Sequence, residues 1–166
     1  MWEIIYQLAP YAPLMIFVAA VSDIFFITGL FLYGAAMMSS IAMMYSMGMI
    51  SLEALLLASY SGTLVGNTLN YWSGRIFDKA PVVEQKLQHP KIQKGREFLR
   101  TKGLFFYILI CRFFMFTRPL YALVLGSLRI NYRRFIFYES IVALAWVALW
   151  TAVLVQGEAV VREFVI

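Results

Sequence analysis

The sequence contains very little of what catalytic sites in soluble proteins are usually built from. Among its 166 residues there is one cysteine and one histidine, and only 14% of residues are charged. The single cysteine, Cys111, excludes an intrachain disulfide, and the single histidine, His89, excludes a multi-histidine metal site. A Ser/His catalytic relay also lacks its parts. We therefore expect no metal, no other cofactor and no enzymatic activity.

Basic residues are missing from the first part of the chain, since no lysine or arginine precedes Arg75. The N-terminal sequence MWEIIYQLAP carries Glu3 where a secretory signal peptide would carry basic residues, and no small-residue cleavage site follows a short apolar core. No leader peptide is predicted.

Apolar residues are abundant instead, at 62% of the chain with a mean hydropathy of +0.76, which indicates an integral membrane protein. The first apolar tract, Ile4 to Trp72, is far longer than the ~20 residues of one membrane span. We divide it into a first helix around Pro13 to Val21, a broken segment from Asp23 to Tyr45 and a full span from Ser51 to Trp72.

Two basic clusters flank the second apolar tract, Gly103 to Gly126. The first, Arg75 to Lys102, holds eight basic residues against three acids, and the second consists of Arg129, Arg133 and Arg134. Basic residues favour the cytoplasmic side of a membrane. A single crossing would place the two clusters on opposite sides, so we predict that the tract enters the membrane and returns.

The tract also contains a helix breaker and two charges, Arg112 and Arg118. Pro119 has no N–H and clashes with the carbonyl of the fourth residue before it, so we expect a turn at Thr117 to Pro119. Each arginine at the bilayer centre costs roughly 2.5 to 3.5 kcal/mol unless it is solvated or paired. The sequence therefore predicts a polar cavity around an internal turn.

Together these features predict an all-α, polytopic membrane protein with two oppositely oriented re-entrant helical hairpins and inverted-repeat topology. A weak internal echo, GLFLY from Gly29 and GLFFY from Gly103, accompanies this pattern. We expect one domain over residues 1–166 in the inner membrane, with a cytoplasmic segment from Arg75 to Lys102. Its parts are a first hairpin plus span (23–73), a basic segment (75–102) and a second hairpin plus span (103–157).

Three stretches resemble the DedA family, also called the VTT or SNARE-associated domain, over about Gly62 to Trp146. They are GTLVGNTLNYWSGR, LRTKGLFFYILICRFFMFTRPLYALVLGSLRINYRRF and ALAW. The most specific positions are Gly62, Gly66, Tyr71, Gly74, Arg75, Arg112, Phe113, Arg118 and Gly126. The resemblance implies flipping or scrambling of phospholipids or undecaprenyl phosphate, often with proton coupling.

The resemblance places Asp23 on the first functional acid of the family. The second acid falls on Ala35, the aspartate usual after the second glycine is Asn67, and the Pro-Gly pair is Tyr33-Gly34. These departures weaken the expectation of proton coupling.

For Arg112 and Arg118 we weigh two roles. Two guanidinium groups can bind a phosphate through planar forks of donors. Alternatively, they satisfy carbonyls freed at the turn or pair with Asp23 or Glu139. Asp23 either couples protonation to movement or caps a helix beginning at Ile24, and Glu139 is interpreted as a solvated or capping residue near a helix end.

Other candidates have mainly structural interpretations. Gly62, Gly66 and Gly74 allow close helix packing within the chain or at a dimer interface, and Asn67 and Tyr71 are further polar candidates. The methionines between Met37 and Met49 are interpreted as flexible packing rather than a copper site.

The segment Asp78 to Lys102 reads as an amphipathic surface helix that draws anionic lipid headgroups. It lacks the aromatic platform of nucleic-acid binders, so we expect no nucleic-acid partner.

The sequence thus predicts a transporter that moves an anionic lipid by alternating access, with Arg112 and Arg118 on the phosphate and Asp23 coupling protons or balancing charge. The alternative is a non-transporting subunit of a larger membrane complex. The expected partners are membrane lipids, with a homodimer or partner subunits also open.

Overall fold

Every element in the described part of the chain is a helix, as the sequence predicts. The computed structural model describes residues 9–28, 45, 48, 50–77, 90–114, 117, 118 and 120–165. Its elements are the 3-10 helix η1 (Ala9–Tyr11) and the α-helices α2 (Ala12–Ile24), α4 (Leu52–Phe77), α6 (Pro90–Lys102), α7 (Leu104–Phe113), α8 (Tyr121–Ser127) and α9 (Tyr132–Val165).

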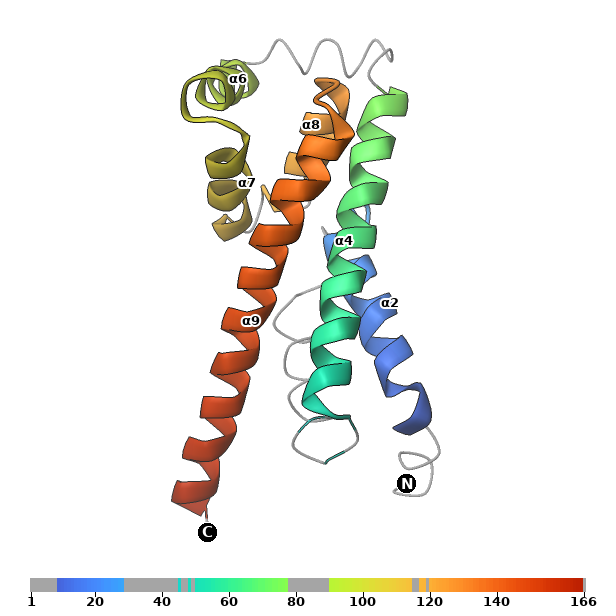
Figure 1. Cartoon of the computed structure of the whole chain (residues 1–166), viewed down its shortest axis with the longest axis vertical. Helices are drawn as coiled ribbons and strands as arrows, with labels where there is room; N and C mark the ends of the chain where they lie inside the picture. The colour runs from blue at the N-terminus through green and yellow to red at the C-terminus, as the bar shows by residue number, and fades with distance from the viewer. Residues whose placement is uncertain are drawn as a thin grey trace.

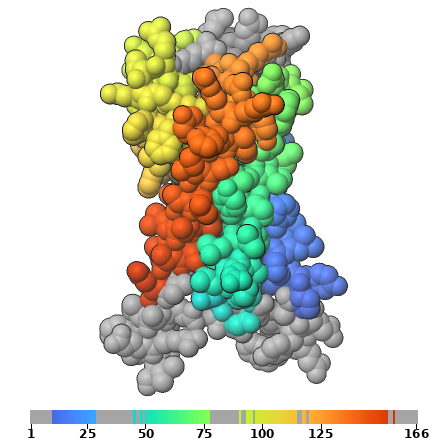
Figure 2. All heavy atoms as spheres, viewed as in Figure 1, coloured from blue at the N-terminus to red at the C-terminus, as the bar shows by residue number. Residues whose placement is uncertain are grey.

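Two long helices, α4 and α9, run in opposite directions along the molecule (Figure 1). They lie side by side on the face drawn in Figure 2, with α6 and α7 against the upper part of α9. α4 contacts α2, α8 and α9, so it lies at the centre of the bundle.

Two shorter helices, α2 and α7, run toward the middle of the molecule from opposite ends and stop there (Figure 1). α2 ends at Ile24 and α7 at Phe113, and the next residues, Phe25 and Phe114, have extended backbones. After the second break the chain turns at Thr117 and Arg118 and resumes as α8. The break that we placed at Thr117 to Pro119 therefore begins earlier, at Phe114.

The predicted helices correspond to longer ones in the structure. The helix around Pro13 to Val21 is α2, the span from Ser51 to Trp72 is α4, and the span predicted at the end of residues 103–157 is α9. Most of the expected broken segment, Asp23 to Tyr45, lies outside the described residues. The prediction that Asp23 caps a helix beginning at Ile24 is wrong, because Asp23 lies in the last turn of α2.

Gly103 separates α6 from α7 and has a backbone φ of +87°. Glycine adopts this conformation without the steric cost of a side chain. α6 is seen nearly end-on in Figure 1, so it crosses the direction of α4 and α9. Of the predicted surface helix Asp78 to Lys102, the second half is helical as α6, and residues 78–89 lie outside the described part.

Glycines bring α4 close to its neighbours. A Cβ atom added at Gly62 would lie 2.7 Å from the Cβ of Ala20 and from the carbonyl oxygen of Phe17 in α2. One added at Gly74 would lie 1.9 Å from the carbonyl oxygen of Leu123 in α8. Gly66 makes a similar approach to Ile24. These contacts are within the chain, and they place α2 and α8 directly on the α4 backbone.

The helix surfaces have an inverted polarity. Polar residues of α4 are buried, among them Thr63, Asn67 and Asn70. Its large apolar side chains are exposed instead, and they include Leu57, Val65, Leu69, Trp72 and Ile76. Apolar surface on this scale is typical of a protein covered by lipid. Among the described residues, one helical stretch has both the length and the hydropathy of a membrane span, Tyr132 to Val153.

Candidate functional site

The carboxylate of Glu139 is the centre of a buried polar cluster. Its Oε1 accepts hydrogen bonds from Arg112 Nη1 at 2.6 Å and Asn67 Nδ2 at 2.7 Å, and its Oε2 accepts one from the Tyr121 hydroxyl at 2.6 Å. Arg112 Nη1 also lies 3.3 Å from the Tyr121 hydroxyl. All four side chains are buried.

Each member of this cluster comes from a different helix. Glu139 belongs to α9, Asn67 to α4, Arg112 to the last turn of α7, and Tyr121 is the first residue of α8. A buried ion pair stays charged only when hydrogen bonds satisfy both partners, and removing one partner leaves an uncompensated charge. The cluster therefore fixes the end of α7 and the start of α8 against α4 and α9.

A second ion pair joins the two helix breaks. Arg118 Nη2 lies 3.1 Å from Asp23 Oδ2, and the two side chains are 27% and 11% exposed. The Arg118 guanidinium also lies over the Trp146 ring, 5.8 Å from its centroid, which is within the range of a cation–π contact. Arg118 is close enough to Arg112 and Glu139 to interact with them electrostatically. The two ion pairs thus belong to one site.

Several polar atoms in the site have no hydrogen-bond partner among the described residues. They are Nε and Nη2 of Arg112, Nε of Arg118 and Oδ1 of Asn67. Buried polar atoms in native proteins are almost always paired, and each exception needs an explanation such as a water or a ligand. Three unused guanidinium nitrogens in one site constitute a set of donors for an anion.

The two helix breaks have the same local structure. The Thr28 hydroxyl donates to the carbonyl oxygens six and three residues earlier, those of Ser22 and Phe25. The Thr117 hydroxyl makes the same two bonds, to Cys111 and Phe114. The sequences DIFFIT in the first break and RFFMFT in the second share a phenylalanine at the third position and the threonine at the sixth. In both breaks, a threonine satisfies carbonyls that the ended helix leaves free.

The first break has an additional support from α4. Asn70 Nδ2 donates to the Ile24 carbonyl oxygen at 2.7 Å, and Asn70 Oδ1 accepts from the Phe26 N–H at 2.8 Å. One side-chain amide therefore replaces both halves of a backbone hydrogen bond. Unsatisfied backbone groups at membrane depth cost several kcal/mol each, and this contact removes two of them.

The structure brings Arg112, Arg118, Asp23 and Glu139 together, and the arginines are paired with the two acids. The interpretation of Glu139 as a solvated or capping residue is wrong, because its side chain is fully buried two turns inside α9. Its position near the start of an apolar helix was misleading, since Arg112 of α7 and Tyr121 of α8 cover that part of α9.

Neither the Tyr71 hydroxyl nor the GLFLY and GLFFY echo belongs to this site. The Tyr71 hydroxyl donates to the Ile130 carbonyl and accepts from Arg75 Nη1, away from Glu139. The GLFLY echo begins after the first break, whereas GLFFY begins before α7, so the two stretches are not equivalent.

Asn70, Tyr121 and the paired threonines were not predicted. The DIFFIT and RFFMFT pattern was a signal for Thr28 and Thr117. Ala35, the Tyr33-Gly34 pair, the methionines from Met37 to Met49 and His89 lie outside the described residues. Within the described segments, no group of three His, Cys, Asp or Glu side chains is placed to hold a metal ion.

Apolar outer faces, a polar interior and broken helices that meet beside a charged cluster define an integral membrane protein with an internal site. A family model described as the VTT domain matches residues 9–156. The chain therefore belongs to the VTT domain family, the domain of the DedA proteins. Comparisons with curated proteins and with solved structures gave no significant match.

Proposed function

We propose that this VTT domain protein moves a lipid with an anionic phosphate headgroup across the bilayer. The observation that carries the proposal is the set of unused donors on Arg112 and Arg118, which lie in one buried site beside two helix breaks. These donors lack a hydrogen-bond partner, and a phosphate supplies both the negative charge and the acceptor oxygens to bind them. The substrate class, the inner-membrane location and the cytoplasmic position of Arg75 to Lys102 are parts of this proposal.

The two ion pairs have different roles in this scheme. The Arg112–Glu139 pair is buried and held by further hydrogen bonds from Asn67 and Tyr121, so it organises the site. The Arg118–Asp23 pair is more exposed and lies on a turn. Arg118 is therefore the arginine that leaves the Asp23 carboxylate and binds the substrate phosphate.

Charge balance links anion binding to proton uptake. Two arginines and two carboxylates leave the site neutral, and a phosphodiester adds one negative charge where the dielectric is low. Protonation of Asp23 restores neutrality and releases Arg118 for the phosphate. Asp23 is assigned this role because its ion pair is the more exposed one, whereas Glu139 is fully buried and held by three hydrogen bonds.

The helix arrangement supports alternating access. α2 and α7 reach the site from opposite ends of the molecule, and the breaks that follow them share one hydrogen-bond pattern. We infer two re-entrant hairpins related by an inverted repeat. In transporters built this way, two halves expose one central site to each side in turn.

The test is leaflet exchange of fluorescent phosphatidylglycerol in vesicles containing the purified protein. We expect exchange with the native protein, strong loss with Arg118→Gln and little change with Arg75→Gln, which removes a charge at the end of α4. Arg118→Gln is a sharper probe than Arg112→Ala, because loss of Arg112 leaves Glu139 buried without its ion-pair partner. A folded native protein that exchanges no lipid would overturn transport and favour the accessory-subunit alternative.

A further inference from the structure

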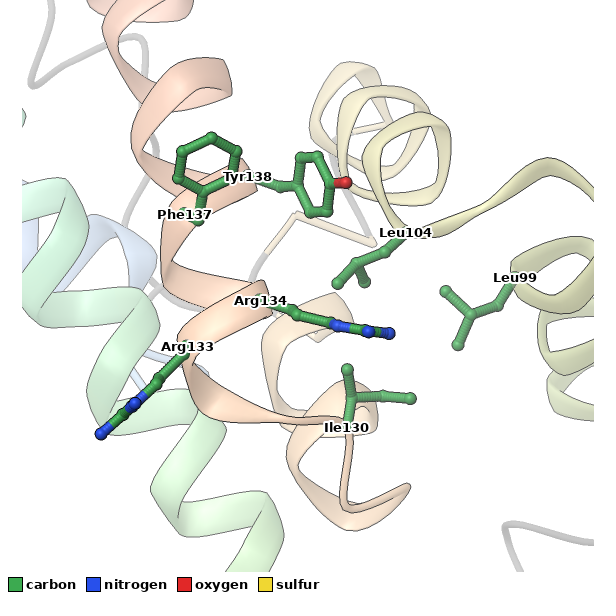
Figure 3. Close-up of a pocket in the computed structure, with 7 residues that line it drawn as sticks. All are labelled: Leu99, Leu104, Ile130, Arg133, Arg134, Phe137 and Tyr138. Atoms are coloured by element: carbon green, nitrogen blue, oxygen red, sulfur yellow. The ribbon is translucent and has the colours of Figure 1, made fainter.

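A second candidate site lies at the end of the bundle where α6, α7 and α9 meet (Figure 3). It is a hollow of about 760 Å³. Leu99 of α6, Leu104 of α7 and Ile130 form part of its lining, together with residues of the first turns of α9. These are Arg133, Arg134, Phe137 and Tyr138. None of the lining residues belongs to the Arg112–Glu139 or Arg118–Asp23 pairs.

The two adjacent arginines of this hollow point in different directions. The Arg134 side chain extends between Leu104 and Ile130 toward Leu99, whereas the Arg133 side chain leaves α9 on the opposite side (Figure 3). Within the described residues, the ion pairs involve other arginines, so neither of these two is neutralised by a described carboxylate. Arg134 is an exposed residue whose guanidinium extends along an otherwise mostly apolar hollow, without a described carboxylate as its partner.

The side chains that line the hollow restrict what fits. Leucine, isoleucine and aromatic side chains are suited to a hydrocarbon chain, and Arg134 is suited to a phosphate. Arg134 lies at the start of the apolar stretch Tyr132 to Val153, where the headgroups of a bilayer would lie. Arg100 and Lys102 at the end of the crosswise helix α6 add positive charge nearby, which favours a net anionic headgroup over a zwitterionic one.

We propose that this hollow binds the phosphate of an anionic lipid through Arg134, with the first part of the lipid chain against Leu104, Ile130 and Phe137. The site is separate from the buried cluster and goes beyond the proposed transport function. A lipid held here packs α6 and α7 against α9 and stabilises the folded protein by binding to it.

The experiment is a titration of the purified full-length protein in neutral detergent with dioctanoyl phosphatidylglycerol, followed by thermal unfolding. We expect a saturable rise in Tm and a much smaller rise with dioctanoyl phosphatidylcholine. Arg134→Gln should weaken the apparent affinity about tenfold, the scale of a lost charge-assisted contact. Arg133→Gln, its neighbour, should change it by no more than about twofold, because the Arg133 side chain points away from Leu104 and Ile130.

A second variant tests the hollow without changing any charge. Leu104→Trp places a larger side chain in the wall that the lipid chain contacts, so the response to phosphatidylglycerol should fall while the Tm of the lipid-free protein stays near the native value. Equal weakening by Arg133→Gln and Arg134→Gln would overturn the proposal, because it would indicate diffuse surface attraction. An equal Tm rise with inorganic phosphate alone would overturn the lipid assignment. Because the readout is binding, failure of transport leaves this test intact.

Discussion

Asp23 and Arg112 occupy the same position in the two helix breaks and carry opposite charges. Each precedes its threonine, Thr28 or Thr117, by the same number of residues, and each lies in the last turn of its helix. Asp23 pairs with Arg118 of the other break, and Arg112 pairs with Glu139 of α9. The breaks thus share a backbone design, while their charges connect them to each other and to the long helix.

Removing the carboxylate of Glu139 should strongly destabilise the protein. Glu139→Ala leaves Arg112 buried without a counter-charge, which costs about 3 to 5 kcal/mol. The measurement is the fraction of monodisperse protein that remains after heating in detergent. Glu53→Ala, at an exposed acid in the first turn of α4, is the control and should have little effect. Equal thermal profiles for the two variants would contradict the buried ion pair.

Replacing Asn70 with leucine should weaken the first break. The change keeps the approximate side-chain volume but leaves the Ile24 carbonyl and the Phe26 N–H without their partner, at about 1 to 3 kcal/mol per buried group. Thermal unfolding measures the loss. Ser61→Ala removes a hydroxyl that bonds only to carbonyls of its own helix and should be nearly neutral. A Tm for Asn70→Leu as high as that of Ser61→Ala would argue against the capping role.

Alanine substitutions at the glycines should follow the distances to the facing helix. Gly74→Ala and Gly126→Ala would place a Cβ 1.9 Å from a carbonyl oxygen, so α4 and α8 must separate, at a cost of about 1 to 3 kcal/mol or more. Gly66→Ala, with its nearest contact at 3.1 Å, should cost less.

Gly95→Ala is the matched control for this series, because its added Cβ would meet Tyr107 at an ordinary 3.7 Å. Alanine is also a better helix former than glycine by about 0.5 to 1 kcal/mol, so this variant should be neutral or stabilised. Thermal unfolding of all four variants gives the ranking, and a Gly74→Ala protein as stable as Gly95→Ala would refute the close α4–α8 contact.

The pH response of transport should depend on Asp23. In the proposed scheme, loss of the Asp23 charge frees Arg118 for a phosphate, so lipid exchange by the native protein should become faster as the pH is lowered. Asp23→Asn cannot change charge, so exchange should lose this dependence. Vesicle assays over a pH series measure both, and Glu53→Gln is the control. A native pH profile retained by Asp23→Asn would exclude Asp23 as the coupling acid.

The sequence could predict the helical class and the presence of a break near Pro119 because both have local causes, but it did not locate the residues at which the breaks begin, Phe25 and Phe114. Long apolar tracts require helices in lipid, and Pro119 and Gly103 disfavour helix continuation at their own positions. It could not predict the role of Glu139, because the residues that bury it are far away in the chain. Asn67, for example, is 72 residues from Glu139, and Arg112 is 27.

The amino-acid sequence alone determined that this chain is an all-helical membrane protein of the VTT domain family with charged residues in an apolar tract. The tertiary structure decided which charge pairs with which, and which arginine donors remain unused. The physical reason is that hydropathy and backbone preference act between neighbours in the chain, whereas an ion pair depends on distances of a few ångströms that only packed helices define.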